Sequence, residues 1–412
     1  MKSMETVLLL GNYRLSLAIA RQLGNAGHAA VVGSTGSKAG TDSVERSRHV
    51  NQVWTHPDMF RNTKVFLASL QGFLDQNPQI SIIMPVSELS LLQLTKWADT
   101  ISLPVAAVDA DTVNTCCDKG KMAQIAAELD VPQAPFAIAE NFEELHAAAA
   151  TVGYPCVARP NDGRNNEVKA YFLEDQHDMN EVFPQWPENH DSLLVQAHAH
   201  GPRYNRYFLA ENGKIINALD VRIERTDRAD GSGFAIEGVS VPAMTAMDDP
   251  SNALVEHLDY TGVGCIQYLV DEGSGQLSFL EINPRLGGNY AFPYYCGLDL
   301  VLPMLALAKK QPLTAWDAPG IYALNKRFIW LYGDVIGMMA GVYNREISLL
   351  GALRWSMKTC RGLLRADTHL TLDWRDLRPS IWYAMLLGEA FVVLLLDTAR
   401  YFKRRLSTAL RA

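Results

Sequence analysis

The chain of 412 residues has a formal net charge of −8, with 48% hydrophobic and 20% charged residues. These values are typical of a folded chain with two or three domains, and they exclude disordered, collagen-like and low-complexity proteins. The six cysteines form no CxxC pair, so we expect neither a disulfide framework nor a cysteine-based zinc site. No apolar run near the start is long enough for a signal peptide, and we therefore expect a cytoplasmic protein.

The N-terminal segment predicts alternating strands and helices. Thr6–Leu10 is a short apolar run, followed by Gly11 and a helical pattern, and Ala29–Val32 and Ile80–Pro85 are the next predicted strands. This order is typical of a parallel, doubly wound α/β sheet. The turn lacks the GxGxxG pattern, so we favour a structural βαβ unit over an NAD site, which also argues against a nicotinamide-dependent reductase.

The middle of the chain has a mixed, antiparallel character. Asp118 is a predicted N-cap for a helix over Lys119–Leu129, and residues 211–213 and 272–275 have the composition of hairpin turns. The strand-like segments are Pro155–Ala158, Leu193–Gln196, Tyr207–Ala210, Lys214–Ala218, Cys265–Val270 and Leu277–Ile282. We therefore predict an α+β region.

The C-terminal region is helical, basic and rich in tryptophan. Residues 321–412 hold 14 Lys and Arg against 7 Asp and Glu, a net charge of +7 that leaves −15 on the first 320 residues. The acidic body argues against nucleic-acid binding, whereas the tail suits an acidic surface. Ile381–Leu396 is very apolar, but as a helix it would span about 24 Å, and it contains Glu389. A buried core helix is favoured over an interfacial helix anchored by Lys403-Arg404-Arg405.

The clearest chemical signal is the segment FLEINPR at residues 279–285. Glu281 and Asn283 lie two apart in a predicted strand, so they share a face, and Gln267 on the neighbouring strand can join them. Three oxygen donors of this kind suit Mg²⁺, with Mn²⁺ as an alternative. Arg285 would then meet a phosphoryl group. The alternative is that Glu281 is only a salt-bridged strand residue.

Three further motifs precede this segment in order: Asp118-Lys119, residues 153–160 (GYPCVARP), and Gln196 through Gly201-Pro202-Arg203. With them the sequence resembles the ATP-grasp superfamily, most closely its carbamoyl-phosphate-synthetase and biotin-carboxylase-like branch, over Thr6 to about Leu307. The resemblance implies a Rossmann-like pre-ATP-grasp domain over residues 1–115, an ATP-grasp domain of two α+β subdomains over 116–318, and a helical basic region over 319–412.

The resemblance also implies a nucleotide site. Lys119 matches the lysine that contacts phosphate. Arg159 stands where the family usually has lysine, and the resemblance implies catalytic roles for both Arg159 and Arg285. A loop over Asn161–Glu167, which contains Gly163 alone where the family often has two or three glycines, would cover the phosphates. The other implied nucleotide contacts are Gln196, the backbone of Ala197 and Ala199 in the adenine-reading strand, Arg203 at the ribose position, and Leu280.

The same resemblance implies the metal and substrate residues. Gln267, Glu281 and Asn283 match the metal ligands, and Gly288 belongs to a glycine loop that approaches the acyl acceptor. Three arginines at 222, 225 and 228 surround a loop over residues 227–233. This is either a solvated hairpin or a lid beside Arg222, which would hold a substrate carboxylate. His198 and His200 lack a third zinc ligand nearby, so we favour a polar rim over a metal site.

These features imply an ATP- and Mg²⁺-dependent ligase that activates a carboxylate as an acyl phosphate and joins it to an amine or, less often, a thiol. The alternative is a catalytically impaired nucleotide-binding regulatory protein. The C-terminal segment loosely resembles the tails of bacterial carboxylate–amine ligases. We expect small-molecule acid and amine substrates, no nucleic-acid partner, and peripheral contact of Ile381–Ala412 with the inner face of an anionic membrane, and we leave a homodimer open. The two substrates cannot be named from the sequence.

Overall fold

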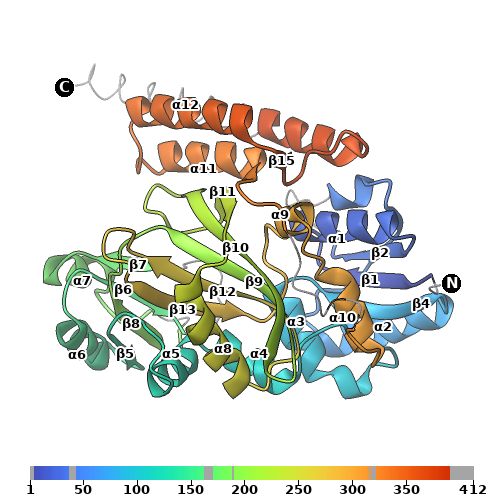
Figure 1. Cartoon of the computed structure of the whole chain (residues 1–412), viewed down its shortest axis with the longest axis horizontal. Coiled ribbons are helices and arrows are strands. Elements are labelled where there is room, and N and C mark those ends of the chain that lie inside the picture. The colour runs from blue at the N-terminus through green and yellow to red at the C-terminus, as the bar shows by residue number, and fades with distance from the viewer. Residues whose placement is uncertain are drawn as a thin grey trace, which may run out of the picture.

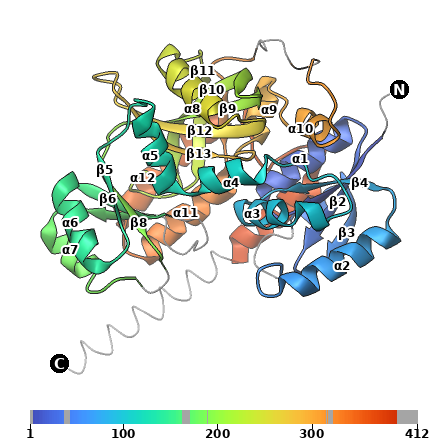
Figure 2. The ribbon, with the colours of Figure 1, turned by 90° about the horizontal axis from the view of Figure 1, so that it is seen from below.

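The computed structural model describes residues 4–36, 43–161, 170–187, 190–314, 316 and 322–389. Its first layer is a four-stranded parallel sheet in the order β3-β2-β1-β4, formed by β1 (Thr6–Leu10), β2 (Ala29–Ser34), β3 (Val50–Thr55) and β4 (Ile80–Pro85). The helices α1 (Arg14–Asn25) and α2 (Thr63–Gln76) cover its opposite faces (Figure 2). Alternate residues of β1 explain this, because Val7 and Leu9 pack with α1 whereas Leu8 and Leu10 pack with α2.

The second layer is a seven-stranded sheet in the order β13-β12-β9-β10-β11-β14-β15. Its strands are β9 (Arg203–Glu211), β10 (Lys214–Thr226), β11 (Ala235–Val241), β12 (Gly262–Val270), β13 (Leu277–Asn283), β14 (Arg327–Ile329) and β15 (Thr368–His369). The predicted hairpin between β9 and β10 turns at Asn212 and Gly213, which both have positive φ, at 49° and 72°. Asparagine and glycine tolerate this conformation, so the turn has suitable residues.

The third layer is a four-stranded antiparallel sheet in the order β5-β8-β6-β7. Its elements are β5 (Phe136–Ala139), α6 (Phe142–Val152), β6 (Cys156–Pro160), β7 (Tyr171–Leu173), α7 (Gln176–Val182) and β8 (Leu193–Ala197). The remaining helices before residue 310 are α3 (Glu88–Lys96), α4 (Ala110–Cys117), α5 (Lys119–Glu128), α8 (Asp248–His257), α9 (Ala291–Cys296) and α10 (Val301–Ala308), with short 3₁₀ turns at Val44–Arg46, Ala98–Thr100 and Thr245–Met247. The fold class is thus the predicted one: a parallel α/β sheet followed by antiparallel α+β sheets.

The C-terminal region is part of the main sheet. Strand β14 pairs antiparallel with β11, and β15 pairs parallel with β14, while α11 (Leu331–Tyr343) and α12 (Leu349–Arg365) lie over one end of the molecule (Figure 1). Residues 377–389 are also helical. We therefore find helices at the C-terminus, as expected, but they are joined to the sheet by two short strands that the sequence pattern did not indicate.

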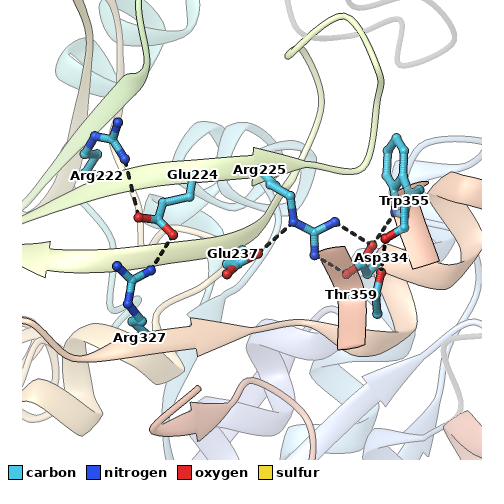
Figure 3. A network of polar contacts seen from close by, with 8 residues as sticks. All are labelled: Arg222, Glu224, Arg225, Glu237, Arg327, Asp334, Trp355 and Thr359. Atoms are coloured by element: carbon cyan, nitrogen blue, oxygen red, sulfur yellow. Dashed lines mark hydrogen bonds and ion pairs between the residues drawn. The ribbon is translucent and has the colours of Figure 1, made fainter. Parts of the chain in front are cut away.

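Buried ion pairs fasten this region to the rest of the chain. Arg225 of β10 donates to Glu237 and, with Nη1 at 3.1 Å, to Asp334 of α11, whose carboxylate also accepts from the indole of Trp355 (Figure 3). On the other side, Arg21 of α1 lies 2.9 Å from Asp376. Because Asp334 and Asp376 are buried, loss of either partner would leave an uncompensated charge.

Several expectations fall on residues outside the described ones, namely Gly163 in the phosphate loop and the basic cluster at 403–405. Of the apolar run, residues 381–389 are described, and Tyr383 within them is buried. Among the described helices, none combines the length and the apolar character that crossing a membrane requires. The three domain limits stay predictions.

Candidate functional site

A cavity of about 810 Å³ lies between the seven-stranded sheet and the four-stranded antiparallel sheet. Strands β6 and β8 form one wall, and β9, β12 and β13 form the other. The cavity is lined by these residues of the predicted site: Lys119, Arg159, Gln196, Ala197, Ala199, Arg203, Gln267, Leu280, Glu281, Asn283, Arg285 and Gly288. The structure thus brings together residues that are spread over positions 119–288 of the sequence.

The predicted metal ligands lie side by side on β12 and β13. Gln267 pairs directly with Glu281 across the two strands, and Asn283 donates through Nδ2 to Glu281 Oε1 at 2.9 Å. Among the described residues, no three His, Cys, Asp or Glu side chains gather as a metal site. The set on β12 and β13 has one carboxylate and two amides, and oxygen donors of this kind fit Mg²⁺, which shares its coordination with water and phosphate.

Positive charges surround Glu281. Burial alone would raise the pKa of Glu281, but the charges of Lys119 and Arg159 and the Asn283 hydrogen bond outweigh it and hold the pKa below its ordinary value. Lys119 begins α5, where its backbone N–H donates to Asn161 O at 3.1 Å. The carboxylate is therefore ionised near neutral pH, as a metal ligand must be.

Arg159 links three parts of the predicted nucleotide site. Its side chain extends from β6 into the cavity wall, where it is partly buried, and desolvation lowers its pKa. Nη2 contacts the side-chain oxygen of Gln196 on β8 and lies 3.4 Å from the carbonyl oxygen of Leu280 on β13. One nitrogen of the guanidinium therefore bridges β8 and β13.

Arg285 follows β13 and points toward the N-terminal layer. Nη1 donates to Leu286 O at 3.2 Å, Nη2 lies 3.5 Å from Glu88, and Nε has no hydrogen-bond partner among the described residues. Burial would lower the pKa of Arg285, but the nearby Tyr13, Glu88 and Glu281 raise it, so the side chain stays charged. Its unused N–H can therefore serve a ligand in the cavity.

The predicted adenine strand is the inner strand β8. The Ala197 N–H already donates to Pro135 O at 2.9 Å, and the His198 N–H donates to Pro155 O at 3.0 Å. The rings of His198 and His200 lie 4.8 Å apart at the cavity wall. This arrangement agrees with a polar rim, and among the described residues these two histidines belong to no cluster of three His, Cys, Asp or Glu side chains.

Arg222 is the one described residue of the predicted site that does not line the cavity. It forms a two-pronged ion pair with Glu272, with Nε–Oε1 at 2.6 Å and Nη2–Oε2 at 3.1 Å. The position of Arg222 therefore does not support the carboxylate-binding role that we expected, because its guanidinium is already paired with the Glu272 carboxylate. The loop it flanks does reach the cavity through residues 230–233, where Arg203 donates to Gly233 O at 3.1 Å.

The sequence analysis missed two groups of cavity residues. Tyr13 and Arg14 come from the start of α1, Phe234 directly precedes β11, and the C-terminal region supplies three more aromatic residues: Trp330, Tyr332 and Tyr383. One signal was available, because Arg14 is the first residue of α1, the positive end of the helix, where a cation is unfavourable. From the sequence, the turn after β1 was notable only because it lacks the GxGxxG pattern of an NAD site.

The comparisons with known proteins agree with this geometry. Residues 238–316 match the family model described as the carbamoyl-phosphate synthase L chain, ATP binding domain. The arginine-specific carbamoyl phosphate synthase large chain of Geobacillus stearothermophilus is 24% identical over 214 residues, which are 50% of this chain and 20% of the relative. The chain thus spans about one fifth of the curated relatives it matches.

Solved structures show the same fold at low identity. An L-amino acid ligase from Bacillus licheniformis has a TM-score of 0.63 at 15% identity, covering 79% of both chains. The biotin carboxylase domain of Hydrogenobacter thermophilus 2-oxoglutarate carboxylase, solved with MgADP and bicarbonate, has a TM-score of 0.59 at 14% identity, covering 79% of this chain and 74% of that one. The chain is therefore distantly similar to proteins of the ATP-grasp superfamily: residues 238–316 match the ATP-binding domain of the carbamoyl-phosphate synthase L chain, and the solved structures show that the fold is shared.

Proposed function

We propose that this protein is an ATP-dependent ligase that activates a carboxylate as an acyl phosphate and joins it to an amine. The observation that carries the proposal is the convergence of Gln267, Glu281 and Asn283 with the cations of Arg159 and Arg285 in one cavity. A carboxylate resists nucleophiles until one of its oxygens becomes a good leaving group, and phosphorylation achieves this. The match of residues 238–316 to the ATP-binding domain of the carbamoyl-phosphate synthase L chain and the fold shared with an L-amino acid ligase support the assignment.

The residues divide the chemistry between them. Lys119 and Arg159 hold the phosphates of ATP, and Gln267, Glu281 and Asn283 would hold a magnesium ion, which neutralises the charge of the triphosphate. A carboxylate oxygen of the acid attacks the γ-phosphorus and ADP leaves. The amine nitrogen then attacks the acyl carbon, phosphate leaves, and the nitrogen loses a proton. Arg285 stabilises the negative charge that spreads over the transferred group.

The alternative is a nucleotide-binding regulatory protein that has lost catalysis, motivated by arginine at positions 159 and 203. The enzyme is favoured because Arg285, the cation proposed to act in phosphoryl transfer, lies in the same cavity as the complete set of Gln267, Glu281 and Asn283. A screen for ADP release separates the two. We expect release that requires Mg²⁺ and one acid–amine pair from a panel of amino acids and small carboxylic acids, whereas nucleotide binding without any release would favour the regulatory protein.

We further propose that the C-terminal region meets an anionic membrane surface, and helix α12 is the observation that favours it. An exposed apolar row falls within an arc of about 100° at the usual helical spacing: Leu349, Leu350, Leu353, Met357 and Leu364. Beside it lie Arg354, Lys358, Arg361 and Arg365, and α12 contains no acidic residue. Helices of this kind lie in the lipid interface.

Helix α12 lies at the outside of the molecule (Figure 1), and the side chains of this row are exposed. We expect the protein to float with vesicles that contain anionic lipid, to remain unbound with neutral vesicles, and to be released by salt. A Leu353→Glu, Met357→Glu double variant should lose the interaction while keeping its ADP release. Equal binding of the variant and the wild type would contradict a lipid-facing α12.

A further inference from the structure

The environment of Arg14 indicates an anion subsite in the cavity. The guanidinium carbon lies 3.6 Å from the ring centroid of Trp330 and 5.2 Å from that of Phe234, and the residue is only 7% exposed. Among the described residues, Nη1 has no hydrogen-bond partner. A buried cation without such partners is costly, and the N-terminal end of α1 adds positive potential at the same place. An anionic ligand would relieve both.

A second unused donor lies close by. Asn289 is 6% exposed and lines the same cavity, and its Nδ2 has no hydrogen-bond partner among the described residues. Its neighbour Gly288 lies against Arg14, because a Cβ on Gly288 would be 3.0 Å from Nη2. The absence of that Cβ lets the guanidinium lie along the backbone. Arg14 and Asn289 thus bring two N–H donors without hydrogen-bond partners to the same cavity, and a guanidinium with an amide N–H suits the oxygens of a carboxylate.

The walls around this subsite are aromatic. The rings of Tyr332 and Tyr383 lie 4.8 Å apart, Trp330 and Tyr332 lie 6.2 Å apart, and Phe234 and Trp330 lie 6.5 Å apart. All four residues line the cavity. Such walls favour an apolar or aromatic body next to the anionic group, since burial of apolar surface is favourable and aromatic rings pack well edge to face.

The subsite and the predicted metal ligands are built by different elements of the same cavity. Arg14 begins α1 and stacks on Trp330, whereas Gln267, Glu281 and Asn283 lie on β12 and β13. We propose, on the basis of the ligase function above, that Arg14 and Asn289 bind a carboxylate that is not phosphorylated. The amine substrate is then an α-amino acid with an apolar or aromatic side chain that packs on Trp330 and Tyr383.

Calorimetric titration of the full chain tests this inference. The probes are L-phenylalanine, L-tyrosine, L-tryptophan, L-leucine and L-methionine, each paired with its carboxamide, in the presence of Mg²⁺ and a non-hydrolysable ATP analogue. We expect at least one amino acid to bind at least about tenfold more tightly than its carboxamide, because the amide leaves the guanidinium without its counter-charge. In Arg14→Gln this ratio should fall to less than about twofold.

The matched control is Arg46→Gln. Arg46 also stacks on a tryptophan of the C-terminal region, at 3.8 Å from the ring centroid of Trp382, but it is exposed and does not line the cavity. This variant should keep the wild-type ratio. If Arg14→Gln does not fold, Asn289→Ala replaces it and should reduce the same ratio in part.

Three results would overturn the inference: no amino acid of the panel binds, the wild type binds acid and amide equally, or Arg14→Gln keeps the preference. Its failure is distinct from failure of the ligase proposal. If the Arg14-dependent preference is present but no acid partner produces ADP, the subsite stands and the ligase function fails. If ADP forms with amines regardless of a carboxylate, the ligase stands and the subsite fails.

Discussion

The two sides of the cavity differ in how the chain builds them. On one side, Gln267 and Glu281 face each other across a hairpin, and Asn283 follows two residues later on the same strand. On the other side, Arg14 meets Trp330, which comes from the opposite part of the chain and is positioned by the short strand β14. The first side is made by local strand geometry and, in our proposal, carries the phosphate chemistry. The second is made by tertiary packing and, in our proposal, selects the substrate.

The largest expected effect on activity comes from the side of the cavity formed by β12 and β13. Glu281→Ala should reduce ADP release at least about 1,000-fold while the fold is kept, because it removes the only charged metal ligand of the set and the counter-charge of the surrounding cations. Glu272→Ala is the matched control, since this carboxylate pairs with Arg222 outside the cavity. ADP release near the wild-type rate in Glu281→Ala would reject the metal assignment.

The next effect concerns how the C-terminal region is attached. Asp334→Ala should destabilise the protein by about 3 kcal/mol, because the change leaves Arg225 partly buried without one of its two carboxylates. Glu181→Ala, which removes an exposed pair with His177, should cost less than about 0.5 kcal/mol. Chemical denaturation measures both. Equal stability of the two variants would mean that α11 contributes little to the fold.

A smaller effect is expected at Arg159. Arg159→Ala should reduce ADP release about 100-fold, since it removes a phosphate-facing cation and the link between Gln196 and Leu280. Arg159→Lys keeps the positive charge and introduces the lysine that the resembled family usually has there, so it should stay within about tenfold of the wild type. Steady-state rates at saturating ATP decide between these expectations. Normal turnover in Arg159→Ala would make the position purely structural.

The smallest effect is a dependence of stability on pH at Asp376. Burial would raise the pKa of Asp376, but hydrogen bonds from Ser47, the Arg48 N–H and Arg21 outweigh it and hold the pKa below its ordinary value. A lowered pKa stabilises the folded state above the unfolded value of about 4, and this stability is lost as the pH falls through the folded value. Asp376→Asn should therefore be less stable at pH 7 by about 1 kcal/mol, and the difference should shrink below pH 4. A constant difference in melting temperature between pH 3 and pH 7 would contradict this account.

The fold class and the side of the cavity formed by β12 and β13 could be predicted from the sequence, because both depend on local residue patterns. Alternation along a strand places Glu281 and Asn283 on one face, and the hairpin brings Gln267 opposite, so spacing alone was sufficient. Trp330 carried no comparable signal, because β14 has only three residues and shows no periodic pattern. Arg222 was expected at the substrate because its charge was visible, but its partner Glu272 lies in a distant turn that a single sequence does not place beside it.

The formation of an acyl phosphate is the central claim, and isotope transfer tests it most directly. Once the screen has identified an acid and an amine, the acid is labelled with ¹⁸O in its carboxylate and the mass of the released phosphate is measured. Our account predicts that one labelled oxygen appears in the inorganic phosphate, together with ADP. Release of unlabelled phosphate, or transfer of the label to AMP, would contradict activation of the carboxylate by the γ-phosphoryl group.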